Sequence, residues 1–231
     1  MTGRLTVVPT PIGNLGDMTT RAIEVLRQCD GVLAEDTRTT GNLLKIWDIQ
    51  KPMKAFHLHN EHRSVDGWVQ EMGRGKHLAL CSDAGTPGIS DPGFLLVRAC
   101  IQAGIEVDCL PGATAFVPAL VLSGFPCDRF IFEGFLPPKK GRTKRITSWL
   151  YEPRTIVCYE SPHRLVRFLG EVVSLCGPQR PVAVVREISK LHQEVRRGTA
   201  AEVLAHFTEQ APRGEIAVVI GSAAAEVPEV D

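Results

Sequence analysis

The stretch "HLALCSDAGTPGISDPG" (77–93) joins a short apolar run to a loop that is dense in turn-forming residues. The run at 77–81 has the length and composition of a buried strand. The twelve residues after it contain three glycines, two prolines, two serines and two aspartates. Glycine permits backbone angles and close approaches that a side chain forbids, and proline fixes turns. The stretch therefore predicts a rigid loop, shaped around a ligand, at the end of a strand.

Apolar runs of strand length alternate with segments of helical period through the first half of the chain. Strands are expected at 4–10, 31–36, 53–59, 77–82 and 105–111, and helices at 19–29 and 64–72. In the second helix, Val65, Trp68, Val69 and Met72 follow the i, i+3, i+4, i+7 spacing of one buried face. Strands that alternate with helices favour a largely parallel sheet covered on both faces.

The pattern pauses at 122–145, where prolines, glycines and a run of charges predict a domain boundary and an exposed loop. We therefore expect two α/β domains, 1–124 and 125–231. In the second domain, strands are expected at 154–160, 180–187, 193–198 and 215–221, with helices at 163–175 and 200–207.

Composition excludes several classes of protein. The 26 basic and 26 acidic side chains cancel, so a nucleic-acid partner must be met by a local patch. No apolar run approaches the roughly 20 residues of a membrane span, and the N-terminal sequence does not resemble a signal peptide. We expect a cytoplasmic protein without membrane contact. Seven cysteines without C-x-x-C spacing indicate reduced, buried thiols, and no metal site is expected.

Polar residues crowd the ends of four predicted strands. They lie in "TPIGNLGD" (10–17), "EDTRTTG" (35–41), "HLHNEHR" (57–63) and the loop at 82–93. In an open α/β sheet, ligands bind outside the carboxyl ends of the strands, so these segments predict one site. None of them matches the dinucleotide or P-loop fingerprint. A turn with a helix N-cap remains an alternative for 10–17, and a solvated helix start remains one for 35–41.

Motifs along nearly the whole chain, from Leu5 to Ile220, carry a family resemblance. They include "TPIGNLGD", "AEDTRTTGNLL", "HNE", "LCSDAGTPGISDPG", "LPGATA", "FEGFLPPKKG", "YESPHRL" and "VREISKL". In this order they resemble the bacterial 16S rRNA (cytidine) 2′-O-methyltransferases, a family of the tetrapyrrole methylase superfamily. One departure is Thr39, which stands where many members have a histidine.

The resemblance implies a two-domain tetrapyrrole-methylase-like fold. Each domain would hold a mixed, largely parallel sheet flanked by helices, and S-adenosyl-L-methionine would bind in the cleft between the domains of a homodimer. The substrate would be the ribose 2′-hydroxyl of a cytidine in the decoding region of 16S rRNA, in the small ribosomal subunit. The implied cofactor contacts are Pro11, Ile12, Gly13, Asp83, Gly85, Thr86, Thr114, Ala115, Cys158, Tyr159 and Val185.

Methyl transfer to a ribose hydroxyl needs positioning and a base, because the hydroxyl loses its proton. Glu35, Asp36 and Glu61 are the candidate bases. Arg38 and Asn60 are expected to orient the ribose or a phosphate. A salt bridge within the site remains an alternative for each acid.

The segment "PPKKGRTKR" (137–145) is the main local basic patch. It carries five cations and no acid, and it predicts phosphate contacts through Lys139, Lys140, Arg142, Lys144 and Arg145. A second basic group comprises Arg186, Lys190, Arg196 and Arg197. A solubilising surface is the alternative for the loop. For the whole protein, the alternatives are a C-methyltransferase acting on a tetrapyrrole and a non-catalytic, cofactor-gated RNA-binding module.

Overall fold

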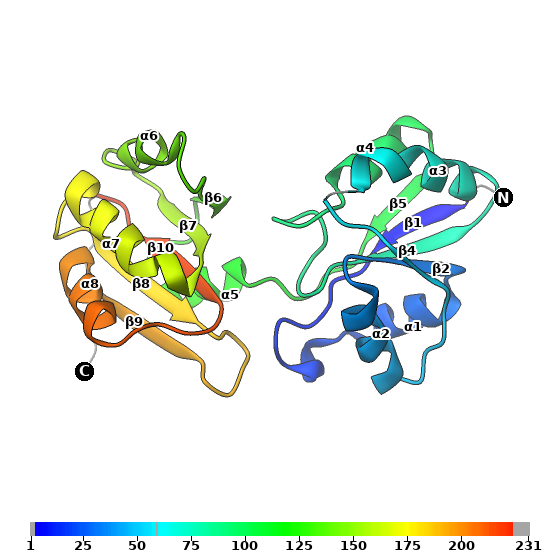
Figure 1. Cartoon of the computed structure of the whole chain (residues 1–231), viewed down its shortest axis with the longest axis horizontal. Coiled ribbons are helices and arrows are strands. Elements are labelled where there is room, and N and C mark those ends of the chain that lie inside the picture. The colour runs from blue at the N-terminus through cyan, green and yellow to red at the C-terminus, as the bar shows by residue number, and fades with distance from the viewer. Residues whose placement is uncertain (1–2, 59, 224–231) are drawn as a thin grey trace. The chain divides into compact units, whose positions relative to one another are not determined.

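The computed structural model describes residues 3–58 and 60–223. The chain forms two compact units, Met1–Thr114 and Ala115–Asp231 (Figure 1). The sequence suggested a boundary ten residues later, after residue 124. Helix α5 (Phe116–Ser123) accounts for the difference, because it packs against four strands of the second unit and buries Ala119 and Leu120 there.

The sheet of the first unit is parallel in every pairing, with the strand order β3-β2-β4-β1-β5. Leu5 of β1 pairs with Leu78 on one side and with Val107 on the other. The strands are β1 (Arg4–Val7), β2 (Gly31–Ala34), β3 (Met53–Ala55), β4 (His77–Cys81) and β5 (Glu106–Cys109). The predicted third strand extended to His59, which lies outside the described residues.

Two helices cover each face of this sheet (Figure 1). Successive residues of β4 show the division, since Ala79 faces one layer and Leu80 faces the other. Helices α1 (Thr20–Gln28) and α2 (Thr37–Ile46) cover the Ala79 face, after the short 3-10 helix η1 (Leu15–Asp17). Helices α3 (Glu61–Gly73) and α4 (Phe94–Gln102) cover the other face.

The second unit holds a mixed sheet with the strand order β6-β7-β10-β8-β9. Only β6 and β7 pair in parallel within the described residues, so this sheet is more antiparallel than predicted. Helices α7 (Pro162–Cys176) and α8 (Ala200–Glu209) cover one face, and α5 packs on the sheet from the other. The strands are β6 (Phe130–Phe135), β7 (Thr155–Glu160), β8 (Pro181–Arg186), β9 (Glu194–Thr199) and β10 (Ile216–Ile220). The α/β fold class is confirmed.

The cysteines are all free thiols, and five of the seven are buried. Burial raises the pKa of Cys81 to about 12, which keeps this thiol protonated and unreactive. Among the described residues, no helix combines the length and the apolar composition that crossing a bilayer requires.

The segment predicted as a boundary and exposed loop contains β6 and helix α6 (Arg142–Thr147). One of the five cations in 137–145 points inward, which corrects the prediction that Arg142 contacts phosphates. Its side chain is 3% exposed and donates to Glu160 at 2.9 Å and to Glu171 at 2.6 Å. The guanidinium also lies 5.4 Å from the ring centre of Phe168. Arg142 therefore joins α6 to β7 and α7 as a structural residue.

Replacing Arg142 with alanine should destabilise the protein by about 3 kcal/mol, because it removes one of the two arginines paired with the buried Glu160 carboxylate and also the ion pair with Glu171. The free energy of unfolding in urea measures this loss. Lys144→Ala is the matched control, since Lys144 is exposed on the same helix and its loss should cost less than about 0.5 kcal/mol. Equal stability of the two variants would contradict a structural role for Arg142.

Candidate active site

The loops after β1, β4 and β5 form one hydrogen-bonded row at the carboxyl edge of the first sheet. Thr10 and Gly85 exchange two backbone hydrogen bonds of 2.9 Å. The Thr10 hydroxyl also donates to the Ser82 carbonyl at 3.1 Å. Farther along, the Thr86 hydroxyl donates to the carbonyl of Ala113 at 3.0 Å. The predicted loop at 82–93 is therefore held on both sides by its neighbours.

Gly85 is required for its backbone conformation. Its φ of +83° lies in the left-handed region that side chains disfavour. A Cβ there would meet Ile12 at 3.5 Å and Ala113 at 3.7 Å, which are ordinary contacts, so space is not the constraint. Next to Gly85, Pro11 and Ile12 are half-buried and Gly13 is exposed, which leaves the β1 loop accessible.

Two acids bind the loops after β2 and β4 to each other. The Glu35 carboxylate accepts from the backbone N–H of Asp83 at 3.1 Å, and the Asp83 carboxylate accepts from the N–H of Asp36 at 3.1 Å. Partial burial raises the pKa of Asp83 above its usual range. Glu35 and Asp83 thus lie together at the carboxyl edge, as the sequence predicted for this group of polar segments.

Asp36 and Arg38 form a local ion pair at the start of α2. The Asp36 carboxylate caps the helix by accepting from the Arg38 N–H at 2.8 Å, and the Arg38 guanidinium donates to it at 2.7 Å. These hydrogen bonds hold the pKa of Asp36 at about 2, well below its usual value. A carboxylate with so low a pKa is a weak base. The low pKa and the ion pair with Arg38 therefore favour the salt-bridge alternative for Asp36.

Glu61 and Asn60 hold loops in place. Glu61 is 5% exposed, and its carboxylate accepts from the backbone N–H groups of Gly93 and Leu95 at 3.0 and 3.1 Å. It therefore caps the first turn of α4. The Asn60 amide accepts from the N–H of His57 and donates to the Ala55 carbonyl. Both side chains are used within the fold, and neither is shown to reach a substrate.

Asp91 is a further acid near Glu35 and Asp83 that sequence reasoning did not single out. It lies in the loop between Gly88 and Gly93, after Ser90, whose φ of +67° marks a tight turn. Burial raises the pKa of Asp91 to about 7, and the negative charges of Glu35 and Asp83 add to the effect. The available signal was a second aspartate in the opening stretch, in "SDPG" (90–93), but nothing in the sequence distinguished it from Asp83.

The predicted cofactor contacts of the second unit lie on neighbouring elements of that unit. Cys158 and Tyr159 are on β7, and Val185 is on β8. Cys158 is fully buried, and its side chain lies on the face covered by α7 and α8. Thr114 and Ala115 are half-buried at the start of α5.

Three lysines remain free in the basic loop. Lys139, Lys140 and Lys144 are exposed and form no ion pair with any described residue. Arg145 is exposed but pairs with Glu133 at 3.2 Å. In the second basic group, Arg186 pairs with Glu194, Lys190 pairs with Glu187 and Glu215, and Arg197 donates to the Leu122 carbonyl. The loop is therefore the stronger candidate for contact with phosphates.

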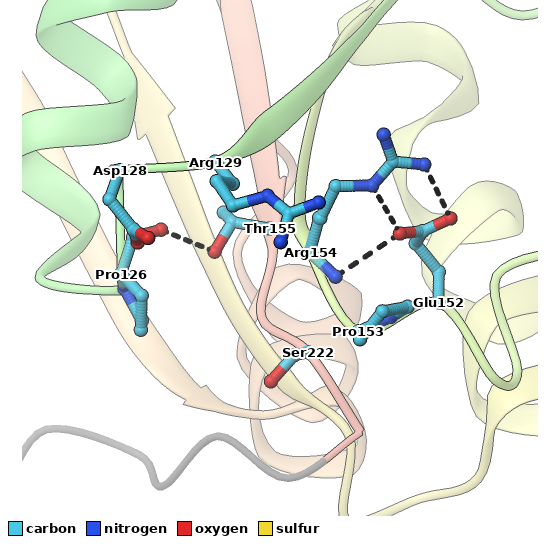
Figure 2. Close-up of a pocket in the computed structure, with 8 residues that line it drawn as sticks. All are labelled: Pro126, Asp128, Arg129, Glu152, Pro153, Arg154, Thr155 and Ser222. Carbon is cyan, nitrogen blue, oxygen red and sulfur yellow. Dashed lines mark hydrogen bonds and ion pairs between the residues drawn. The ribbon is translucent and has the colours of Figure 1, made fainter.

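A hollow of about 570 Å³ lies in the second unit, at the amino-terminal end of β7 (Figure 2). The Glu152 carboxylate and the Arg154 guanidinium form a two-pronged ion pair on its wall, and Thr155 donates to the Pro126 carbonyl at 2.6 Å. None of the predicted site residues lines this hollow. It lies at the opposite end of β7 from Tyr159, so the carboxyl edge of the first sheet remains the candidate active site.

Comparison with known proteins assigns the chain to a family. Residues 4–204 match the family model described as tetrapyrrole (corrin/porphyrin) methylases. The chain belongs to the tetrapyrrole methylase family. The superfamily predicted from the motifs is thereby confirmed.

Curated relatives of this methylase share nearly half of its residues. It is 48% identical to the ribosomal RNA small subunit methyltransferase I of Synechocystis sp. over 97% of this chain and 81% of the relative. It is 46% identical to the protein of the same name from Thermotoga maritima, over 94% of this chain and 98% of the relative.

Solved structures share the fold at low sequence identity. Uroporphyrin-III C-methyltransferase of Thermus thermophilus, complexed with S-adenyl homocysteine, is 18% identical, with a TM-score of 0.65 over 96% of this chain and 98% of that one. A diphthine synthase is 11% identical, with a TM-score of 0.75 over 95% and 90%. These likenesses show the tetrapyrrole methylase fold.

Asp91→Asn should stabilise the protein increasingly as the pH rises. The pKa of Asp91 is higher in the folded protein than in the unfolded chain, so its stabilising contribution is complete below about pH 4 and disappears as the pH rises through 7. Because Asp91 is only half-buried, solvent screens part of the effect, and the variant should gain on the order of 1 kcal/mol over the wild type between pH 5 and pH 8. Urea unfolding at both values tests this, with the exposed Asp66→Asn as a control for loss of one charge. If the free energies of unfolding of the variant and the wild type differ by the same amount at pH 5 and at pH 8, the partial burial of Asp91 is contradicted.

Proposed function

We propose that this methylase transfers a methyl group from S-adenosyl-L-methionine to the ribose 2′-hydroxyl of a cytidine in 16S rRNA, in the decoding region of the small ribosomal subunit. One observation carries the proposal: relatives that match nearly all of this chain at 46–48% identity are ribosomal RNA small subunit methyltransferases. The motif resemblance supports the choice of cytidine and of the 2′ oxygen. We also propose a cytoplasmic homodimer, as that resemblance implies.

The carboxyl edge of the first unit suits this cofactor in charge and in shape. S-adenosyl-L-methionine carries a sulfonium and an ammonium group, and the carboxylates of Glu35 and Asp83 bring negative charge to this edge. Gly85 is buried beside the half-buried Ile12, and its lack of a side chain lets the loops after β1 and β4 pair closely at this edge. Oppositely charged groups and close backbone contacts both favour binding. The remaining contacts, at Gly13, Thr86, Thr114, Ala115, Cys158, Tyr159 and Val185, are proposed on the resemblance.

The bound cofactor supplies an electrophilic methyl group, so the protein's tasks are to position a hydroxyl and to remove its proton. Among the acids of the site, Asp91 is the best base. Its pKa of about 7 makes it ionised at slightly alkaline pH, yet more basic than an ordinary carboxylate. Asp36 binds a proton too weakly to act as the base. Glu61 is held at the start of α4 by the two backbone N–H groups that donate to its carboxylate. Burial is the main cause that keeps the pKa of Asp91 high, and the negative charges of Glu35 and Asp83 add to it.

Product analysis tests the proposed reaction. The protein is incubated with radiolabelled S-adenosyl-L-methionine and, in separate reactions, with unmethylated small subunits, free 16S rRNA and a porphyrinoid. Nuclease digestion and mass spectrometry then locate the label. The expected product is 2′-O-methylcytidine in 16S rRNA. Label on a nucleobase, or on the porphyrinoid alone, would overturn the proposal, and the latter result would favour tetrapyrrole C-methylation.

Asp91→Asn should lower the single-turnover rate of methyl transfer by about 100-fold or more, because positioned bases contribute roughly that much. Affinity for the cofactor should change little by comparison. The wild-type rate should rise with pH to a plateau above about 7, as Asp91 loses its proton. Asp36→Asn is the control, and it should keep the midpoint of this profile. A wild-type rate that is constant from pH 6 to pH 8 would exclude Asp91 as the base.

Replacing Lys139, Lys140 and Lys144 with glutamine should weaken RNA binding and flatten its salt dependence. Each lost phosphate contact should reduce the log–log slope by about 0.7 to 0.9. Filter binding between 50 and 300 mM KCl measures the slope. A double substitution of the exposed Lys45 and Lys54 in the first unit controls for lost charge. If both variants keep the wild-type slope, RNA binds elsewhere.

A further inference from the structure

A row of five aromatic rings lies along β6, β7 and α5 in the second unit. Phe130 and Phe132 of β6 flank Phe116 of α5, with ring centres 6.3 and 4.6 Å from it. Tyr159 continues the row 5.2 Å beyond Phe132, and Phe135 ends it 5.4 Å beyond Tyr159. These distances fall in the range of direct contact between aromatic rings, so the row is continuous.

A β-bulge brings the end of the row onto the same face of the sheet. Phe132 pairs with Val157 and Phe135 pairs with Tyr159, so Glu133 is an extra residue in the ladder. Because side chains alternate along a strand, residues three apart would otherwise point to opposite faces. Gly134 adopts a φ of +59° at the bulge. The extra residue therefore turns Phe135 to the side of Tyr159, away from the core formed with α7.

The Phe135 ring is the exposed end of the row. It is 56% exposed, while Tyr159 behind it is half-buried and Leu136, the next residue along the chain, is buried. The ring is thus backed by a second ring and held by a buried neighbour. Lys139 and Lys140 follow after two prolines, four and five residues along the chain. Four residues span at most about 14 Å, so the Cα atom of Lys139 lies within that distance of the Cα atom of Phe135, and Lys140 follows it directly.

We infer that Phe135, backed by Tyr159, is a stacking platform for an unpaired base of the RNA substrate, with Lys139 and Lys140 contacting phosphates of the same strand. The inference rests on the proposed function. Aromatic rings beside a basic segment are how proteins bind single-stranded RNA, since bases stack on the rings while cations hold the backbone. A ring backed by a second ring is already oriented for this contact.

Phe135→Ala tests the platform with a ten-residue oligocytidylate as the probe. RNA affinity should fall by roughly 5- to 100-fold, the usual effect of losing one stacked base. The salt slope should keep its wild-type value, because no phosphate contact is removed. Phe135→Trp, which keeps an aromatic ring at this position, should bind the oligocytidylate as the wild type does. Tyr151→Ala is the matched control, since Tyr151 is an 86% exposed aromatic residue before the other end of β7.

A second probe separates stacking from a general loss of structure. An oligomer of the same length with abasic sugars offers phosphates but no bases. The wild type and Phe135→Ala should bind the abasic oligomer with the same low affinity, because it has no base to stack on the ring. Weaker binding of the abasic oligomer by the variant, or unchanged binding of oligocytidylate, would overturn the inference.

Two further measurements distinguish the remaining cases. A change in sedimentation coefficient with unchanged RNA affinity would show that Phe135 contacts a second copy of the chain, and would overturn the platform. If the wild type methylates 16S rRNA and Phe135→Ala binds RNA normally, the platform fails and the proposed function stands. If the wild type neither binds nor methylates RNA, both fail.

Discussion

Every pairing in the first sheet is parallel, and this single constraint places the carboxyl ends of all five strands at the same edge. Residues far apart in sequence, such as Thr10, Glu35 and Asp83, meet there because their strands end there. The loops then fix one another through backbone hydrogen bonds. A ligand site built in this way has rigid walls before any ligand arrives, which is what positioning two reactants demands.

The same edge gathers several carboxylates, and their hydrogen bonds divide the work among them. Asp36 is held ionised by Arg38, and Glu61 caps α4. Asp91, buried beside Glu35 and Asp83, is left with a proton affinity near neutrality. Partial burial, aided by the like charges of two neighbours, thus gives one carboxyl of the group a pKa far above that of Asp36.

The sequence predicted what depends on local pattern. Alternation and helical period located β4 and α7 well, and glycine and proline density identified the loop at 82–93. What it missed depends on tertiary partners. Arg142 has the same local pattern as Lys144, and only the fold reveals Glu160 beside it. Strand β6 was hidden by glycine and proline, although its aromatic residues are typical of strands. Asp91 and Asp83 differ in burial, which no local pattern reports.

Leu136 and Arg142 are 4% and 3% exposed, and the five residues between them are all exposed. The segment is therefore anchored at both ends over a short span, once by apolar burial and once by a buried ion pair. A segment tethered in this way has few conformations to lose when it is immobilised, so ordering it costs little conformational entropy. The inward-pointing Arg142 thus limits the positions open to the exposed Lys139 and Lys140.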